Sequence, residues 1–270
     1  MNKTLKALAQ AAMCSALLAA ACGRDDNNGV PPSAGDETLT FAVGDVSFKM
    51  VKVQAGTFTM GANEGDPDAA ASKTRHEVTL TSDFYIGQTE VTQALYKAVT
   101  GTNPSFFDSD STQPVERVKY TDVLAFCETL SSLTGRTFTL PTEAQWEYAA
   151  RGGHKAPATP TLYAGGDDID RVAWYSGNSG GKSQPVGQKE PNALGLHDMS
   201  GNVWEWCLDW KGDYGSAAQT DPQGPATGTD RIFRGGGWYQ SALFSRVSHR
   251  DGYIPQFSNE CLGFRVVMLP

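Results

Sequence analysis

Cysteine is scarce in this sequence. The 270 residues include five cysteines, and no two of them have the close spacing that is typical of zinc ligands. Cys14 and Cys22 lie near the N-terminus, which leaves Cys127, Cys207 and Cys261 at wide spacing in the rest of the chain. These three allow at most one disulfide, and the sequence favours the interpretation that all three are small buried side chains.

Positive charge is also in short supply. The 22 lysines and arginines against 30 acidic residues give a formal net charge of -8, and removal of the two charges of Lys3 and Lys6 makes it -10. A protein with this balance has no electrostatic reason to bind nucleic acid or anionic lipid. After residue 21 no second apolar run is long enough to span a membrane. We therefore expect no nucleic-acid partner.

Recognisable motifs of common catalytic sites are absent too. The sequence has no nucleophile elbow and no phosphate-binding glycine loop, and His76-Glu77 lacks the second histidine of a zinc-protease helix. His154, His197 and His249 are widely separated from one another. We expect the four histidines to occupy ordinary surface or core positions.

Residues 1–21 have the pattern of a signal peptide. Lys3 and Lys6 precede a run of small and apolar residues that ends in three alanines directly before Cys22. The run is too short to span a bilayer comfortably. The junction resembles a bacterial lipobox, although Ala19 stands where leucine is usual. This resemblance implies cleavage before Cys22 and lipidation of Cys22, which would anchor the chain to a membrane. Ordinary secretion, with Cys22 as a free thiol, stays open as the alternative.

Residues 22–38 have the composition of a tether. The stretch is rich in glycine, proline, asparagine and aspartate, and it has no apolar periodicity. Gly23 followed by Arg24-Asp25-Asp26 resembles the start of lipoproteins of the outer membrane or cell surface. We therefore expect a protein of the bacterial cell envelope in which residues 39–270 form the folded part.

The folded part shows many short strands and few helices, which predicts the α+β class. Apolar patterning indicates strands at Val46–Val53 and Thr57–Met60, and we expect these two to form a hairpin around Ala55-Gly56. Two more short strands are expected at Glu77–Thr81 and Phe84–Ile86.

Three helices are also expected. Thr89–Val99 and Thr121–Leu133 have helical apolar spacing, and Gly135 terminates the second of them. A third helix begins after Thr142, because Thr142 and Gln145 form a capping box. The first two helices should pack against a sheet.

Six motifs follow one another between Met50 and the C-terminus. They are Met50–Gly61, Phe84–Thr92, Leu140–Gly152, Gly195–Trp206, Arg234–Trp238 and Gly263–Arg265. In this order they resemble the sulfatase-modifying-factor, or formylglycine-generating-enzyme, family. The resemblance implies a single α+β domain with a C-type-lectin-like fold, few helices, short strands and much irregular loop. It also implies that Trp146, Trp204, Trp206 and Trp238 are core aromatics.

The motif Gly195–Trp206 contains a set of oxygen ligands. Asp198 and Glu205 supply carboxylates, and Gly201 and Val203 supply backbone carbonyls, which together suit Ca²⁺. These four positions match a structural calcium site of the family, and a second family site should lie near Trp174–Gly180. The alternative is that the two acids only cap a turn.

The family's enzyme oxidises a cysteine of a client sulfatase to formylglycine, and it holds copper(I) with two cysteines. In this sequence the matching positions are Gln240 and Ser245, and Cys261 stands alone elsewhere in the tail. An amide and a hydroxyl cannot replace two thiolates as ligands of a soft ion. We therefore expect no catalytic residues of the oxidase type and no copper.

The C-terminal segment resembles the variable proteins of diversity-generating retroelements, some of which are surface lipoproteins of this fold. Gly236-Gly237-Trp238 and Leu262–Val267 match the frame of those proteins, with Gly237 in place of the usual serine. Mixed aromatic and small polar residues between them are typical of a paratope. The expected ligand-binding residues are Tyr239, Gln240, Ser241, Phe244, His249, Asp251, Gly252, Tyr253, Ile254, Phe257, Ser258 and Glu260. The alternative is an ordinary C-terminus whose aromatics are core.

Three functions of different classes are compatible with these patterns. The leading hypothesis is a noncatalytic surface lipoprotein that binds a protein or another surface ligand through its C-terminal segment. The second is a formylglycine-generating oxidase that acts on sulfatase cysteines. The third is a structural lipoprotein of the cell envelope. A cysteine pair or another metal site in the pocket would favour the oxidase, and a partner patch elsewhere would favour the structural protein.

Overall fold

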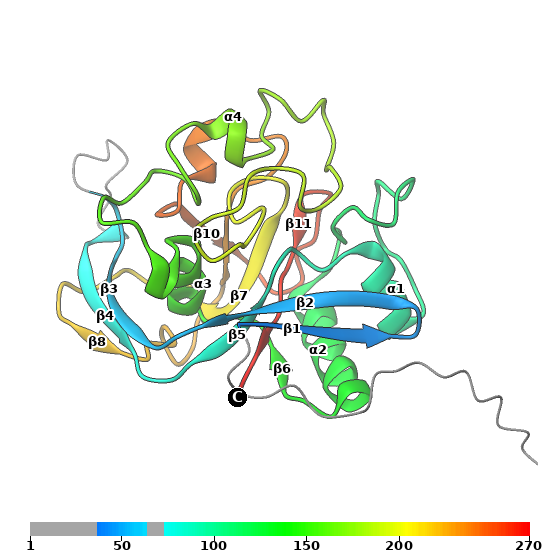
Figure 1. The fold of residues 1–270 in the computed structure, drawn as a ribbon, viewed down its shortest axis with the longest axis horizontal. Helices are drawn as coiled ribbons and strands as arrows, with labels where there is room; N and C mark the ends of the chain where they lie inside the picture. The colour runs from blue at the N-terminus through cyan, green and yellow to red at the C-terminus, as the bar shows by residue number, and fades with distance from the viewer. Residues whose placement is uncertain (1–36, 64–72) are drawn as a thin grey trace, which may run out of the picture. The chain divides into compact units, whose positions relative to one another are not determined.

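The computed structural model describes residues 37–63 and 73–270 (Figure 1). The expected signal peptide, Cys22 and nearly all of the expected tether lie outside the described residues. Within the described part, no helix has the length and hydropathy needed to cross a bilayer. The first strand, β1 (Thr38–Val43), begins close to the position where the folded part was expected to start.

A five-stranded sheet combines both ends of the described chain, in the order β1-β2-β5-β12-β6. Its other members are β2 (Val46–Val53), β5 (Phe84–Gly87), β12 (Val267–Met268) and β6 (Phe138–Thr139), and every neighbouring pair is antiparallel. The last strand therefore lies inside the sheet, between β5 and β6, and not at its edge. Figure 1 shows the red C-terminal strand in this position.

Two smaller sheets complete the strand structure. A four-stranded sheet has the order β10-β9-β7-β11, and a three-stranded sheet has the order β3-β4-β8. The bounds of the first are β10 (Arg250–Tyr253), β9 (Arg231–Arg234), β7 (Trp204–Trp210) and β11 (Leu262–Gly263). The bounds of the second are β3 (Gly56–Met60), β4 (His76–Leu80) and β8 (Gln219–Thr220).

The expected hairpin between Val46–Val53 and Thr57–Met60 is wrong, although both strands form. β1 and β5 occupy the two edges of β2, so β3 pairs with β4 in another sheet. The chain leaves the first sheet at Ala55, whose N–H donates to Asp83 Oδ1 at 2.8 Å. At Gly56 a Cβ atom would lie 2.3 Å from the Tyr148 hydroxyl, so a larger residue here would have to displace the Tyr148 ring.

Helix α1 (Gln93–Thr100) begins four residues after the expected start at Thr89. Thr92 is its N-cap, and the Thr92 hydroxyl accepts a hydrogen bond from the Leu95 N–H at 3.2 Å. Val91 lies outside the helix, because its N–H donates to Phe264 O and its carbonyl accepts from Val115 N–H. Tertiary hydrogen bonds thus override the helical spacing of residues 89–91.

The other two expected helices are confirmed. Helix α2 (Tyr120–Thr134) ends at Gly135 with a φ of 67°, as the terminator predicts. Helix α3 (Glu143–Ala150) has the expected capping box, since Thr142 and Gln145 exchange side-chain and backbone hydrogen bonds. A single-turn helix, α4 (Ile169–Val172), lies in the long irregular stretch that follows.

The core has two main parts. Helices α1 and α2 pack on the five-stranded sheet, where Tyr96, Phe126 and Phe264 make ring contacts. Helix α3 packs against β3, β7 and β9, with a fully buried Trp146 at the contact. Trp204 and Trp206 are also buried, whereas Trp238 is only partly buried. Cys127, Cys207 and Cys261 are buried free thiols, as expected.

Candidate functional site in the C-terminal segment

A cavity of about 490 Å³ opens on one face of the four-stranded sheet. Every strand of that sheet contributes to it, and loops 239–244 and 257–261 close its sides. Among the described residues its lining consists of Trp204, Phe233, Tyr239, Gln240, Ser241, Phe244, Asp251, Tyr253, Phe257, Asn259, Cys261 and Leu262. Segments far apart in the sequence therefore build one concave surface.

Aromatic rings dominate this cavity. Trp204 and Phe233 lie at its base, are 4 % and 7 % exposed, and contact each other at a centroid distance of 5.0 Å. Tyr239 and Tyr253 are each 49 % exposed and lie at its rim. Tyr253 packs on Phe257 at 4.3 Å. A buried base with an exposed rim of the same chemistry is typical of a binding pocket.

Gln240 and Ser245 do not lie together in this cavity. Gln240 lines it, and its Oε1 atom is buried without a hydrogen-bond partner among the described residues. Ser245 is fully buried outside the lining, in a short 3₁₀ turn at Ala242–Ser245. Burial raises the pKa of the Cys261 thiol to about 12, so the one thiol of the cavity is protonated at neutral pH.

A buried ion network holds the frame of the cavity. Arg234, at the end of β9, donates to Glu143 Oε1 at 2.9 Å and to Glu147 Oε2 at 2.5 Å, both on α3. Arg250, at the start of β10, pairs with the same Glu143 through two hydrogen bonds, at 2.7 and 2.6 Å. Helix α3 is thereby tied to two strands of the sheet that carries the cavity.

The aromatic surface continues beyond the C-terminal segment. The rings of Phe106, Phe107, Trp238 and Tyr239 follow one another at centroid distances of 5.0, 5.4 and 5.3 Å. Phe106 is 61 % exposed. Its loop is held by Phe107, whose N–H donates to buried Glu116 at 2.8 Å and whose carbonyl accepts from Gln93 at 2.6 Å.

Three of the four expected calcium ligands, Asp198, Gly201 and Val203, lie in the turn before β7, and Glu205 lies in β7 itself. Asp198 and Glu205 are buried beside buried Glu90, and Arg265 is the guanidinium that faces them. The Glu205 carboxylate accepts from Arg265 Nε at 2.6 Å, from Arg265 Nη2 at 2.7 Å and from Trp146 Nε1 at 2.7 Å. Asp198 Oδ1 is buried and has no hydrogen-bond partner among the described residues.

Burial shifts the pKa values of the carboxylates in and beside this turn. It raises the pKa of Glu90 well above the ordinary value, and the charges of Asp198 and Glu205 add to the effect. The pKa of Asp198 is raised for the same first reason. Glu90 accepts hydrogen bonds from Asn202 Nδ2 and from the Val203 N–H. Among the described residues, no three histidine, cysteine, aspartate or glutamate side chains are arranged to hold a metal ion.

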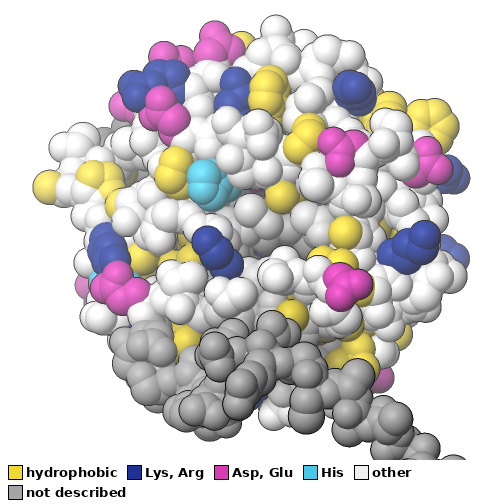
Figure 2. All heavy atoms as spheres, turned by 45° about the vertical axis from the view of Figure 1, so that its right-hand side comes forward, with side chains coloured by type: hydrophobic (Ala, Val, Ile, Leu, Met, Phe, Trp, Pro, Cys, Tyr) yellow, Lys and Arg dark blue, Asp and Glu magenta, His cyan; other side chains and the backbone are white. Residues whose placement is uncertain are grey.

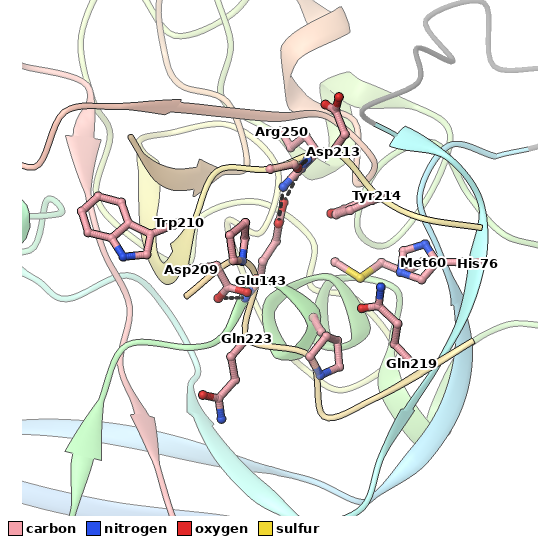
Figure 3. A pocket seen from close by; sticks show the side chains of 15 residues that line it. Met60, His76, Glu143, Asp209, Trp210, Asp213, Tyr214, Gln219, Gln223 and Arg250 are labelled. Carbon is pink, nitrogen blue, oxygen red and sulfur yellow. Dashed lines mark hydrogen bonds and ion pairs between the residues drawn. The ribbon is translucent and has the colours of Figure 1, made fainter. Parts of the chain in front are cut away.

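A second, smaller cavity of about 290 Å³ lies beside the ion network (Figure 3). Met60, His76 and Gln219 come from the three strands of the smallest sheet and face Asp209 across it. The Asp209 carboxylate accepts from the Glu143 N–H at 2.8 Å. Burial, and next the charge of Glu143, raise the pKa of Asp209 to about 7.

Comparison with known proteins identifies the family. Residues 44–269 match the model of the sulfatase-modifying factor enzyme 1-like domain. This chain belongs to that family. Its fold is correspondingly the C-type-lectin-like fold of formylglycine-generating enzymes, with mixed helix and sheet and much loop.

Three relatives show the range of the family. The chaperone protein LppX of Paenibacillus barcinonensis is 33 % identical over 82 % of this chain and 90 % of its own length. The formylglycine-generating enzyme of Streptomyces coelicolor is 35 % identical over 56 % of this chain, which spans about half (51 %) of that enzyme. The structure of Treponema denticola variable protein 1 has 33 % identity and a TM-score of 0.79, over 86 % of this chain and 99 % of that one.

The structure brings seven of the expected ligand-binding residues into the cavity. They are Tyr239, Gln240, Ser241, Phe244, Asp251, Tyr253 and Phe257. Asp251 and Tyr253 point into it from β10, and Gly252 between them is buried on the other side, because side chains alternate along a strand. His249 packs behind the wall, against Trp204 and Phe244. Ile254, Ser258 and Glu260 do not line the cavity.

Five lining residues were missed by the sequence analysis. Trp204 was expected only as a core aromatic, Cys261 as a buried thiol and Leu262 as part of the frame. Phe233 and Asn259 were not singled out. No local pattern marks them, because they reach the cavity only through the pairing of β7 with β9 and β11. Near the expected second calcium site, Trp174 forms an isolated bridge with Gly201.

Proposed function

We propose that this family member is a noncatalytic binding protein of the bacterial cell envelope that takes up a ligand in its C-terminal cavity. The observation that carries the proposal is the lining itself. Seven residues of one short C-terminal segment and the ends of a rigid sheet form an aromatic hollow with a few polar groups. Rigid aromatic side chains give contact area at a small cost in conformational entropy, which suits ligand binding.

The chemistry of the cavity argues against the oxidase. Gln240 and Ser245 stand at the positions where the family's enzyme has its two cysteines, and Ser245 is not part of the lining. Cys261 is a single, buried and protonated thiol. Copper(I) binding by the oxidase needs two thiolates, which these residues do not supply.

The names of the relatives are consistent with binding. One relative is called a chaperone protein and another a variable protein, and both match nearly the whole of their own length. We infer from them that the ligand is a protein or another surface molecule. Diversification of the C-terminal segment in this chain is part of the proposal, as is attachment to the outer membrane or cell surface through lipidated Cys22.

The test uses the full chain in mild detergent. We expect a screen of small-molecule fragments by saturation-transfer NMR to find ligands whose binding falls at least tenfold in Tyr239→Ala and Tyr253→Ala. Leu133→Ala is the matched control, because Leu133 is 57 % exposed on α2, away from the cavity lining. Absence of any fragment that depends on the cavity residues would overturn the proposal.

The same preparation separates the alternatives. Incubation with copper(I) and a sulfatase-type cysteine peptide, followed by mass spectrometry, should leave the cysteine unchanged. Conversion to formylglycine would establish the oxidase. A stable envelope complex that survives both tyrosine substitutions would instead favour a structural lipoprotein.

We also propose that Ca²⁺ binds at the turn of Asp198, Gly201 and Val203, with Glu205 at its edge. Three buried carboxylates face one guanidinium there, and an oxygen of Asp198 lacks a partner. A divalent cation would balance this excess of negative charge. Ca²⁺ should therefore raise the melting temperature of chelator-treated protein, and the rise should shrink in Asp198→Ala. An unchanged melting temperature would show that Arg265 alone balances the turn.

A further inference from the structure

Among the described residues, the cavity lining carries negative charge and no positive charge. Six of its 12 lining residues are aromatic, one is the carboxylate of Asp251, and none is lysine, arginine or histidine. The faces of aromatic rings carry negative partial charge, so a cavity lined in this way attracts cations and repels anions.

A second acid, Glu260, is next in the sequence to a lining residue. Glu260 is exposed and follows directly on Asn259, which lines the cavity. Burial raises the pKa of Tyr239 to about 12, neighbouring Cys261 adds to this rise, and the negative charge of Glu260 makes a smaller addition. The charge of Glu260 also helps to raise the pKa of Cys261, after the larger effect of burial. The electrostatic influence of the acid therefore reaches two lining residues.

Among the polar groups of the lining, Asp251 is the one that carries a charge. Oε1 of Gln240 is buried and has almost no accessible surface, so an entering group does not reach it. A ligand that carries positive charge would thus satisfy the rings and the Asp251 carboxylate together.

The protein itself places an ammonium group next to this carboxylate. Lys211 Nζ lies 2.7 Å from Asp251 Oδ1, but Lys211 does not line the cavity. The two side chains are 37 % and 46 % exposed, and exposed pairs of this kind stabilise proteins little. Lys211 is therefore a weak competitor that an entering cation can displace.

We propose that the cavity recognises a protonated alkylamine, of the kind that a lysine side chain of a protein partner presents. The inference rests on the proposed binding function and specifies its ligand. The ammonium group would lie among the rings of Tyr239, Tyr253 and Phe257, with the Asp251 carboxylate as its polar partner. The negative net charge of the chain, -8 in the full sequence, favours the approach of such a group.

The test compares two ligands that differ only in the ammonium group. N-acetyl-lysine amide and N-acetyl-norleucine amide are titrated into the full chain in mild detergent, and saturation-transfer NMR gives both dissociation constants. We expect the lysine derivative to bind about tenfold more tightly, which is the range of a desolvated cation–π contact. Equal or tighter binding of the norleucine derivative would overturn the inference, yet it would leave a working cavity.

Two substitutions at the rim should act in opposite directions. Asp251→Asn removes the carboxylate and should weaken lysine binding several-fold, while norleucine binding stays the same. Lys211→Gln removes the competitor and should strengthen lysine binding two- to threefold. Leu133→Ala serves again as the control. Loss of affinity in Lys211→Gln, or no change in Asp251→Asn, would contradict the assignment.

Discussion

At the scale of single residues, Arg234 links helix α3 to the four-stranded sheet that carries the cavity. Its guanidinium is fully buried and touches Glu143, Glu147 and the carbonyl of Val247. Buried charges are costly when they lose a partner, because water no longer reaches them. The arginine of this motif therefore holds the C-terminal segment against helix α3.

Replacement of Arg234 by methionine should lower the free energy of unfolding by about 3 kcal/mol, since it removes one of the two arginines that each buried glutamate contacts. Glu143 then keeps only Arg250, and Glu147 keeps only Arg151. Urea denaturation followed by fluorescence gives the value. Arg171→Met is the matched control, because the Arg171–Glu190 pair is 63 % and 55 % exposed and should contribute less than about 1 kcal/mol. Equal losses in the two variants would contradict this account.

Glu116 makes stability depend on pH. Its burial raises the pKa from 4.5 to about 7, so the folded state binds the proton more tightly than the unfolded state. The stabilisation is fully present below the unfolded pKa and is lost as pH rises through the folded value. We expect the Glu116→Gln protein to lose about 1–3 kcal/mol less stability than the parent between pH 4.5 and 7.5.

Urea midpoints at several pH values would check this expectation. The amide can still accept from the Phe107 N–H, so the loop that carries Phe106 and Phe107 should keep its place. Asp209, whose pKa is also raised to about 7, should leave a residual fall in the variant. Identical pH profiles for parent and variant would refute the role of Glu116.

At the scale of secondary-structure elements, a short turn determines the shape of the cavity wall. Gly236 has a φ of 77°, and a Cβ atom there would lie 2.8 Å from the carbonyl oxygen of Phe244. The 3₁₀ turn that carries Phe244 therefore packs directly on the backbone of Gly236. Gly180 has a similar φ of 67°, but nothing lies within 4 Å of its Cβ position.

Substitutions at Gly180 and Gly236 distinguish the cost of backbone strain from the cost of steric overlap. Gly180→Ala should cost only about 1 kcal/mol for its left-handed backbone, whereas Gly236→Ala must also displace the Phe244 turn and should cost about 2–4 kcal/mol. Urea denaturation measures both. Gly236→Ala should in addition weaken fragments that bind in the cavity. Similar costs for the two variants would show that the turn can move freely.

The prediction of helix α1 was right about the type of element and wrong about where it begins. Apolar spacing predicts a helix from Thr89, but Val91 bonds to Phe264 and Val115, and Thr92 caps the helix that follows. This later start also affects the turn of the proposed calcium site. Glu90 lies outside the helix, and its carboxylate accepts hydrogen bonds from Asn202 Nδ2 and the Val203 N–H.

At the scale of the whole molecule, the face shown in Figure 2 mixes acidic and basic side chains and has no broad patch of one sign. In the proposed function, binding therefore depends on the local cavity, since mixed surface charges are screened by salt. The proposed anchor at Cys22 would hold that cavity close to a membrane. The described residues contain no helix that is long and apolar enough to cross a membrane.

The anchor has a direct test in bacterial cells. The full chain should fractionate with membranes and incorporate labelled fatty acid, because cleavage before Cys22 exposes the thiol for acylation. Cys22→Ser should move the protein to the soluble fraction and abolish the label. Cys14→Ser is the control and should change neither. Membrane association that persists in Cys22→Ser would contradict the lipoprotein assignment.

The sequence by itself determined the family, the helix boundaries with local signals, and the absence of a thiol at both oxidase positions, Gln240 and Ser245. These follow from motifs and from contacts a few residues apart, such as the Thr142–Gln145 capping box, which need no knowledge of the rest of the chain. Only the tertiary structure decided that β3 leaves β2, and that Trp204, Phe233 and Cys261 join the C-terminal residues in one cavity. Strand pairing depends on which distant edge is free, and a hollow depends on side chains from several strands, so neither is written in any local pattern.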